Sequence, residues 1–308
     1  MSRHIAIITD DPGWHGQQLR KAFNAKGYRC TNVSLKSCHL DTALKPYGLC
    51  IPGFEGSLPS GVFVRGVPGG TLEEVVFYLD ILHAMRELNV FVYNEVRAIE
   101  RSVDKGMTSF LLSQAGISTP PTWVGNNIHD AYAFVRKQLG SGYKVVLKPL
   151  FGSQGKNLQL ITGHSDFADF TLYNNLFYLQ RYIETGSEGA HDWRLLVIGE
   201  RVVAMMKRQG SGWISNVATG GKCIPAVLDE KFTGLAKSAV KAVDMHYGGV
   251  DVMRDDCGTL WVTEVNSIPA WKGLQSVSQI DVSEMLVEHF LCSLQQYSDF
   301  TCSDKIGG

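Results

Sequence analysis

Three oxygen-bearing side chains in the last fifth of the chain have the types and spacing of a cation site. Residues 249–253 and 259–266 each read as a short strand, with an Asp- and Gly-rich turn between them. Side chains alternate between two faces of a strand, so Glu264 and Asn266 share one face with Val262. If the strands pair as a hairpin, Asp251 lies on that face too. Two carboxylates and an amide oxygen favour magnesium or manganese over zinc. The alternative is a solvent-facing hairpin with ordinary polar residues.

Two lysines are placed where an anion could bind. Lys148 ends an apolar strand over 143–147 and is followed by a loop with Gly152 and Gly155. Glycines let backbone amides approach phosphate oxygens, and the lysine adds a charge. The loop lacks the Gly-Lys-Ser/Thr ending of a P-loop, and a plain hairpin turn is its alternative. Lys105 opens a helix over 104–114, where a cation gains nothing from the helix dipole, so a bound anion is one reason for it.

Two arginines lie on a pair of expected strands joined by Gly199 and Glu200. Arg194 belongs to the first strand and Arg208 to the second, and Asp192 precedes Arg194 by two residues. Arginine can grip phosphate or carboxylate with two parallel hydrogen bonds. Surface arginines on a hairpin are the alternative.

Composition limits the class of protein. With 308 residues, 44% hydrophobic and 19% charged, the chain has the balance of a globular protein with two or three lobes. A net charge of −1 gives no reason to expect nucleic acid or an anionic membrane as a partner. The seven cysteines are scattered without zinc-type spacing, which indicates reduced thiols, and the N-terminus lacks a signal-peptide pattern. We therefore expect a cytoplasmic protein.

The first hundred residues alternate strand and helix signals. Strands are expected over 5–9, 30–33 and 61–64, and a helix follows with a capping box formed by Thr71 and Glu74. We expect its apolar stripe to face the core, with the members Leu72, Val75, Val76, Leu79, Leu82 and Leu88. The pattern predicts an open α/β domain with a mostly parallel sheet. Ligands bind such sheets at the carboxyl ends of the strands, so Asp10, Asp11 and Arg65 are cleft candidates, with turn capping and surface charge as the alternative.

After residue 100 the pattern changes to longer strands mixed with helices. Helices are expected over 104–114, 130–139, 229–245 and 282–297, and strands over 195–198 and 202–206. The predicted division is an N-terminal α/β domain over 1–100, a central subdomain over 101–180 and a C-terminal subdomain with the cation site over 181–308.

Taken in order, the motifs of the whole chain resemble one family. They are Asp104-Lys105, Pro120-Pro121-Thr122, Val146-Leu147-Lys148-Pro149, Gly152-Ser153-Gln154-Gly155, Leu179-Gln180-Arg181-Tyr182-Ile183, Asp192-Trp193-Arg194, Asn216 with Gly220-Gly221, Gly249-Val250-Asp251 and Glu264-Val265-Asn266-Ser267-x-Pro269. This order resembles the ATP-grasp superfamily and, within it, the RimK-like glutamate ligases. The resemblance implies α/β and α+β lobes in an ATP-grasp fold with an N-terminal Rossmann-like pre-ATP-grasp domain.

The resemblance also implies roles for single residues. The ATP-binding residues would be Lys105, Lys148, Gly152, Ser153, Gly155, Gln180, Arg181, Tyr182, Ile183 and Asp192. Asp251, Glu264 and Asn266 would hold two magnesium (or manganese) ions. Arg208 would face the transferred phosphate, and Arg194 and Asn216 the reacting carboxylate. Arg65 would hold a substrate carboxylate, near Asp11.

The implied reaction is amide formation driven by ATP. A carboxylate attacks the γ-phosphate to give an acyl-phosphate and ADP, and an amine then displaces phosphate. Positioning and positive charge would supply most of the catalysis. The expected product joins L-glutamate, or a similar amino acid, to a small-molecule or cofactor carboxylate.

The sequence departs from the family where acceptors are chosen. Ile214-Ser215-Asn216 replaces Arg-Ser-Asn, and Ala270-Trp271-Lys272-Gly273 stands where a Gly-Leu-Glu-Gly type is usual. Loss of positive charge and gain of an indole suggest a ring-containing substrate that stacks on Trp271, with internal packing as the alternative.

Two other functions remain open at this stage. One is a dipeptide or D-alanine–D-alanine type ligase of the same superfamily, and the other is a nucleotide-binding protein without turnover. The expected partners are small-molecule carboxylates and amino acids, without nucleic acid or membrane. The resemblance also implies a homo-oligomer, either a dimer or a tetramer.

Overall fold

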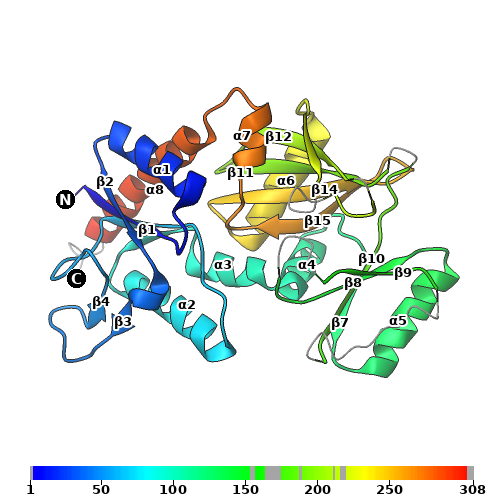
Figure 1. The fold of residues 1–308 in the computed structure, drawn as a ribbon, viewed down its shortest axis with the longest axis horizontal. Helices are drawn as coiled ribbons and strands as arrows, with labels where there is room; N and C mark the ends of the chain where they lie inside the picture. The colour runs from blue at the N-terminus through cyan, green and yellow to red at the C-terminus, as the bar shows by residue number, and fades with distance from the viewer. Residues whose placement is uncertain are drawn as a thin grey trace. The chain divides into compact units, whose positions relative to one another are not determined.

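The computed structural model describes residues 3–152, 157–163, 175–186, 189–210, 212–215 and 220–303. The chain forms two compact units (Figure 1). The first contains residues 1–100, 268–272 and 280–308, and the second contains 101–267 and 273–279. Each unit is described by itself.

The first unit is built on a parallel sheet of four strands, as the alternating strand and helix signals predicted. The strand order is β2 (Arg29–Val33), β1 (His4–Ile8), β5 (Gly61–Val64) and β6 (Phe91–Tyr93). Helices α1 (Gly13–Ala25) and α2 (Leu72–Glu87) connect these strands, and short segments β3 (His39–Leu40), β4 (Leu49–Cys50) and the 3₁₀ turn Leu35–Ser37 form an added loop region. Strand β1 is completely buried, which fits the apolar run of a central parallel strand.

Helix α2 corrects one expectation. The capping box of Thr71 and Glu74 is present. The expected stripe is only partly buried: Leu82 lies in the core and Leu79 and Leu88 pack against it, whereas Leu72 is 75% exposed and Val76 is 46% exposed. The buried residues of the helix are Tyr78, Ile81, Leu82 and Met85. Both faces of this helix are apolar, so the 3.6-residue period alone did not select the correct one.

The C-terminal helix α8 (Val282–Ser303) also belongs to the first unit, although the sequence division places it in the C-terminal subdomain. Its Phe290 is fully buried and packs against Phe23 (5.2 Å between ring centroids) and Phe63 (5.8 Å). Gly61 lies so close to this ring that a Cβ there would come within 2.9 Å of it. The chain therefore returns to the N-terminal sheet for its last helix, and the subdomain boundaries inside the second unit stay a prediction.

The second unit contains two antiparallel sheets. The first has the order β7 (Thr122–Gly125), β10 (Phe177–Arg181), β8 (Val145–Lys148) and β9 (Gln159–Ile161), with helix α5 (Ile128–Gly140) packed on it. The second has the order β13 (Lys222–Pro225), β12 (Arg201–Gln209), β11 (His191–Ile198), β14 (Tyr247–Arg254) and β15 (Leu260–Asn266). Helices α4 (Lys105–Gln114), α6 (Glu230–Val243) and α7 (Lys272–Val277) lie beside them, and α3 (Val96–Val103) leads from one unit to the other.

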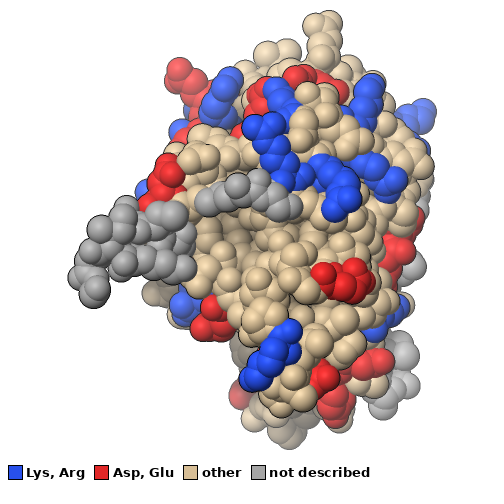
Figure 2. Space-filling view, turned by 90° about the vertical axis from the view of Figure 1, so that its left-hand side faces the viewer, with Lys and Arg blue, Asp and Glu red and all other residues tan. Residues whose placement is uncertain are grey.

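Charged side chains are unevenly spread over the face drawn in Figure 2. Lys and Arg gather in its upper part, and uncharged residues line the hollow below them. The net charge of −1 therefore hides a local basic group. No helix in the described part of the chain combines the length and hydropathy needed to cross a membrane.

Candidate functional site

The hairpin of β14 and β15 brings two of the three expected cation ligands face to face. Asp251 pairs in register with Glu264, so the two residues lie on one face of the hairpin, as expected. The next pair is Val252 with Val262, so Thr263 is an extra residue that bulges out of β15. The bulge interrupts the strict alternation expected along this strand. As a result Thr263 and Glu264, which are neighbours in sequence, both line the same pocket.

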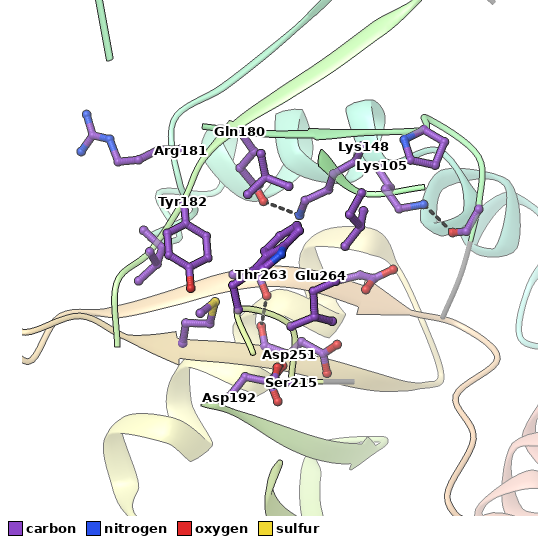
Figure 3. Close-up of a pocket in the computed structure, with 18 residues that line it drawn as sticks. Lys105, Lys148, Gln180, Arg181, Tyr182, Asp192, Ser215, Asp251, Thr263 and Glu264 are labelled. Atoms are coloured by element: carbon purple, nitrogen blue, oxygen red, sulfur yellow. Dashed lines mark hydrogen bonds between the residues drawn. The ribbon is translucent and has the colours of Figure 1, made fainter. Parts of the chain in front are cut away.

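This pocket lies within the second unit and collects most of the predicted nucleotide residues (Figure 3). Cationic and carboxylate groups line it together with an apolar wall. The lining residues are Lys105, Val146, Lys148, Pro149, Gly152, Leu158, Gln180, Arg181, Tyr182, Ile183, Asp192, Trp213, Ile214, Ser215, Asp251, Met253, Thr263 and Glu264.

Lys148 is the cation at the end of β8. Its Nζ donates to Oε1 of Gln180 at 2.7 Å. Burial lowers the pKa of Lys148 to about 8; Glu264 opposes the fall and Lys105 adds to it. The side-chain amide of Gln180 is also used inside the protein, because Nε2 donates to Tyr178 (2.9 Å) and Thr122 (3.1 Å). An anion in the pocket would stabilise the charged form of this lysine.

Lys105 reaches the glycine loop from the start of α4. Its Nζ donates to the carbonyl oxygens of Gly152 at 2.6 Å and Leu150 at 3.3 Å. The N-cap of the helix is Asp104, whose carboxylate accepts from the amide of Met107. The lysine therefore links α4 to the first glycine of the loop. The other two expected loop residues, Ser153 and Gly155, lie outside the described residues.

The end of β10 and the two residues after it contribute Gln180, Arg181, Tyr182 and Ile183 to the pocket lining. The amides of Arg181 and Tyr182 already donate to the carbonyls of Pro121 and Lys144, both at 2.9 Å. The side chain of Arg181 points away from the pocket (Figure 3). It lies 3.8 Å from the centroid of the Tyr143 ring, and its Nε donates to Gln138. Backbone groups near Ile183 are therefore the better candidates for binding a base.

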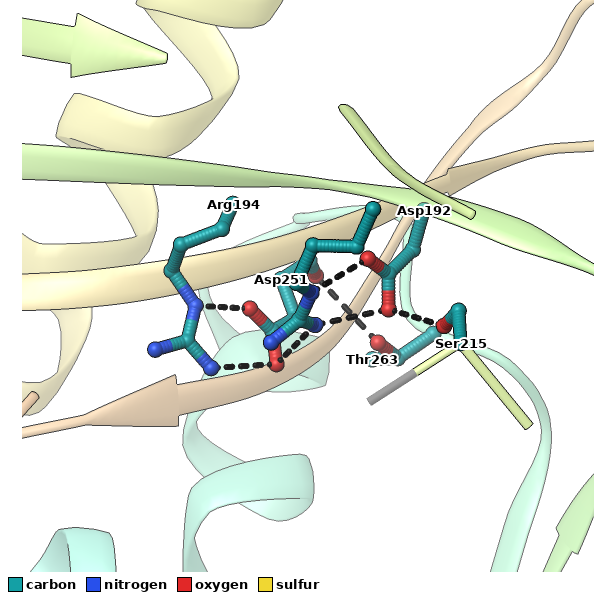
Figure 4. A network of polar contacts seen from close by, with 6 residues as sticks. Asp192, Arg194, Ser215, Asp251 and Thr263 are labelled. Atoms are coloured by element: carbon teal, nitrogen blue, oxygen red, sulfur yellow. Dashed lines mark hydrogen bonds and ion pairs between the residues drawn. The ribbon is translucent and has the colours of Figure 1, made fainter. Parts of the chain in front are cut away.

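Beneath the pocket, two arginines and two aspartates form a buried network (Figure 4). Arg194 grips both carboxylate oxygens of Asp251. Arg208 grips both oxygens of Asp192 at 2.6 Å and also reaches Asp251 at 2.8 Å. The hydroxyl of Ser215 donates to Asp192 at 2.6 Å. Asp192, expected to contact ATP, thus has its carboxylate engaged with Arg208 and Ser215.

The network stabilises the charges of Asp251 and Arg208. Burial alone would raise the pKa of Asp251, but Arg194 and Arg208 reverse this and hold it below its ordinary value. Burial disfavours the charge of Arg208, yet Asp251 and Asp192 outweigh it and raise its pKa. Two arginines and two aspartates are paired here, so the formal charges of the network cancel.

The expected cation ligands are only partly gathered. Glu264 lines the pocket and, within the described ranges, has no ion pair, so its carboxylate can accept a cation. Asp251 shares its oxygens with two arginines. Asn266 lies opposite Gly249, outside the set of pocket-lining side chains. No cluster of three or more His, Cys, Asp or Glu suited to a metal occurs in the described part of the chain. The hard oxygens of Asp251 and Glu264 nevertheless fit magnesium in their chemistry.

A separate group of predicted residues meets in the first unit. The amide of Arg65 donates to the carbonyl of Ile8, so Asp11 and Arg65 follow adjacent parallel strands as expected. The guanidinium of Arg65 lies 4.7 Å from the centroid of the Trp271 ring. Trp271 is 0% exposed, which agrees with the alternative of internal packing, and stacking on a substrate stays a prediction. Asp10 pairs with Lys36 at 3.1 Å, which agrees with its surface alternative.

Sequence reasoning missed several residues that line the pocket. Thr263 enters through the bulge, and Trp213 lies 6.3 Å from the Tyr182 ring, centroid to centroid. Ser215 ties the segment before Asn216 to Asp192. Ser215 could have been found from the sequence, because it directly precedes the predicted Asn216. Asn216 itself is outside the described residues.

Comparisons with known proteins agree with this geometry. A model of the RimK-like ATP-grasp domain matches residues 102–290. The chain is similar to the tetrahydromethanopterin:alpha-L-glutamate ligase of Methanococcus maripaludis, with 31% identity over 241 residues that cover 76% of this chain and 80% of the relative.

Solved structures support the fold. The chain is similar to the ATP-grasp ligase PsnB, which was solved in complex with a phosphomimetic variant of its minimal precursor, Mg and ADP. The TM-score is 0.72 and the sequence identity is 16%, and the match covers 95% of this chain and 99% of PsnB. It is also similar to a RimK domain ATP-grasp protein from Sphaerobacter thermophilus, with a TM-score of 0.69 and 18% identity over 93% of this chain and 98% of that chain. The expected fold is thereby confirmed.

Proposed function

The chain belongs to the RimK-like ATP-grasp family of ATP-dependent carboxylate–amine ligases, and on that premise we propose that it joins L-glutamate, or a similar amino acid, to a small-molecule carboxylate through an acyl-phosphate. The observation that carries this proposal is the pocket of the second unit. There the buried Lys148, Lys105 and the loop glycine Gly152 lie together with the carboxylates of Asp251 and Glu264.

The cations divide into two proposed roles. Lys105 and Lys148 bind ATP phosphates, and Tyr182 with the backbone around Ile183 holds the adenine. Arg208, anchored by Asp192, stabilises the charge of the transferred phosphoryl group. Ser153 and Gly155, which lie outside the described residues, are proposed as further ATP-binding residues.

Magnesium is proposed as the cofactor, with two ions. Glu264, Asp251 and Asn266 would hold it, and it would neutralise phosphate charge. The oxygen ligands of Glu264 and Asp251 fit this ion, and PsnB was solved with Mg and ADP.

The reaction separates into two displacements. A carboxylate oxygen attacks the γ-phosphorus and ADP leaves, and the amine nitrogen then attacks the acyl carbon, expels phosphate and loses a proton. Arg194 and Asn216 are proposed to orient the carboxylate, and Arg65, beside Asp11, to hold the carboxylate of a substrate. Water must be kept out, because it would hydrolyse the acyl-phosphate.

Stimulated ADP release tests this function. Purified full-length protein is incubated with Mg-ATP, L-glutamate and a panel of small carboxylic acids, and products are identified by mass spectrometry. We expect at least one acid to stimulate ADP release only when L-glutamate is present. Lys148→Met should remove this activity, whereas Lys144→Met, at the half-buried lysine that pairs with Glu184 (2.8 Å), should retain it. ADP binding without stimulation by any pair would favour a nucleotide-binding protein without turnover.

Small-molecule substrates, a cytoplasmic location and a homo-oligomeric state complete the proposal. Size-exclusion chromatography with light scattering would distinguish a dimer or a tetramer from a monomer.

A further inference from the structure

The four-stranded antiparallel sheet of the second unit carries different side chains on its two faces. Leu147 and Leu179 belong to the apolar core that packs on α5. Tyr178 pairs in register with Lys148, and Gln180 follows Tyr178 by two residues, so these three side chains share the opposite face. A buried polar group therefore lies on the sheet face that carries the lysine.

The side-chain amide of Gln180 uses both of its polar atoms inside the protein. Its Oε1 accepts from Nζ of Lys148 at 2.7 Å (Figure 3). Its Nε2 donates to the hydroxyls of Tyr178 (2.9 Å) and Thr122 (3.1 Å). An amide nitrogen has two hydrogens, so both are taken. Gln180 is also only 2% exposed, and its side chain has no donor left for a nucleotide.

The hydroxyl of Thr122 decides which way this amide faces. It donates its single hydrogen to the carbonyl oxygen of Pro120 at 2.8 Å, so it can only accept from Gln180. If the amide turned over, Oε1 would meet the oxygen of Thr122 and Nε2 would meet the ammonium of Lys148, and neither pair could form a hydrogen bond. The oxygen of Gln180 is therefore held toward Lys148.

Tyr178 contacts both the glutamine and the lysine. Its hydroxyl accepts from Gln180 and shares a hydrogen bond of 2.8 Å with Ser109 of α4. Its ring centroid is 5.6 Å from Nζ of Lys148, within the range of a cation–π interaction. Burial raises the pKa of Tyr178 to about 12, so the hydroxyl keeps its proton at pH 7. The tyrosine thus helps to fix the lysine directly and through the glutamine.

We propose that Gln180 and Tyr178 are positioning residues that hold the ammonium of Lys148 for a phosphate of the nucleotide. A lysine has a flexible four-carbon stem, and fixing it before the ligand arrives reduces the conformational entropy lost on binding. The inference rests on the proposed ligase function, which makes ATP the substrate of this pocket. It assigns the side chain of Gln180 to the lysine, whereas the resemblance implies a contact with ATP.

A double-mutant cycle tests the inference, with ADP titrated calorimetrically into the full-length protein in the presence of magnesium. Gln180→Met keeps the approximate size of the side chain and removes the acceptor for the lysine, so the dissociation constant for ADP should rise about tenfold. Added to Lys148→Met, the same change should have no further effect, because Gln180 acts through the lysine. Lys105 remains in that background and should keep the affinity measurable.

Two smaller changes keep the test valid even if the glutamine variant fails to fold. Tyr178→Phe and Thr122→Val each remove one hydroxyl that holds the amide and nearly conserve the shape of the side chain. Each should raise the dissociation constant for ADP about 2- to 5-fold, and the effect should vanish in the Lys148→Met background.

Gln138→Met is the matched control. Gln138 is another buried glutamine, 5% exposed, and its Oε1 accepts from Nε of Arg181 at 2.9 Å. It belongs to α5, which packs on the other face of the same sheet. Its replacement should leave the dissociation constant for ADP at the parent value.

The outcomes separate the inference from the proposed function. Parent-like ADP affinity in Gln180→Met, Tyr178→Phe and Thr122→Val would overturn the inference and leave the ligase function standing. Equal effects of these substitutions with and without Lys148 would do the same, because they would then act independently of the lysine. Failure of the parent protein to bind ADP would count against the ligase function itself.

Discussion

The arginines of the two units are held in opposite ways. In the second unit, Arg208 and Arg194 grip the carboxylates of Asp192 and Asp251, so each positive charge is matched by a nearby negative one. In the first unit, Arg65 is oriented by an indole face and a backbone carbonyl. Carboxylate partners fix an arginine and balance its charge, whereas an indole ring and a carbonyl contact it through groups that carry no formal charge.

This difference gives the two regions different sensitivities. The pocket should respond to changes of charge, because its lysines, arginines and carboxylates balance one another. The Arg65 cluster, which Arg65 forms with Trp271 and His15, should respond to changes of shape, because an uncharged ring and an imidazole set its geometry.

Removal of one carboxylate charge from the pocket is expected to have the largest effect. Glu264→Gln keeps the size of the side chain and removes the anion that faces the pocket, so stimulated ADP release should fall by about 100-fold or more. Glu200→Gln, the same change at a side chain that is 83% exposed, is the control and should be neutral. Parent-like activity in Glu264→Gln would show that this carboxylate is not a cofactor ligand.

A pH series should give an intermediate effect. Lys148 has a pKa of about 8, so it is charged at pH 7 and loses its proton as the pH rises through that value. The dissociation constant for ADP should therefore increase about tenfold from pH 7 to pH 9, measured by calorimetry. Lys148→Arg remains charged and should flatten this profile, while Lys144→Arg should follow the parent. A flat parent profile would contradict the assignment of Lys148 to phosphate.

The Arg65 cluster should show a smaller effect, on stability. The folded pKa of His15 is about 4, below the ordinary value of 6.5, so between these values the unfolded chain binds more protons. This contribution to stability is therefore lost as the pH falls from 6.5 toward 4. His15→Gln should lessen the fall in melting temperature between pH 7 and pH 5 by about 1–3 °C. The exposed His129→Gln is the control, and an identical pH dependence in His15→Gln and the parent would contradict the neutral imidazole.

The sequence predicted the pocket better than the cluster because the pocket residues carry local signals. Strand alternation and turn residues placed Asp251 and Glu264 on one face of a hairpin, and the strand-end position of Lys148 was recognisable. The bulge at Thr263 was not recognisable from the sequence, because one extra residue does not visibly change the alternation of apolar and polar residues in a seven-residue strand. The pairing of Asp192 with Arg208 also required the register of β11 and β12, which places the two side chains directly opposite each other.

The first unit shows why burial is harder to predict than secondary structure. Helix α2 begins at its capping box as expected, but its two faces are both apolar, and only packing decides between Leu72 and Tyr78. The packing of Trp271 involves His15 and Arg65, which are more than 200 residues away in sequence. Contacts over such separations are set by tertiary structure and have no local signature.

Isotope transfer tests the central claim most directly. A carboxylic acid that stimulates ADP release is labelled with ¹⁸O in both carboxylate oxygens, and the phosphate released during amide formation is measured by mass spectrometry. Activation through an acyl-phosphate predicts one ¹⁸O atom in each phosphate, because the oxygen that attacked the γ-phosphorus leaves with it. Amide product accompanied by unlabelled phosphate would contradict the account.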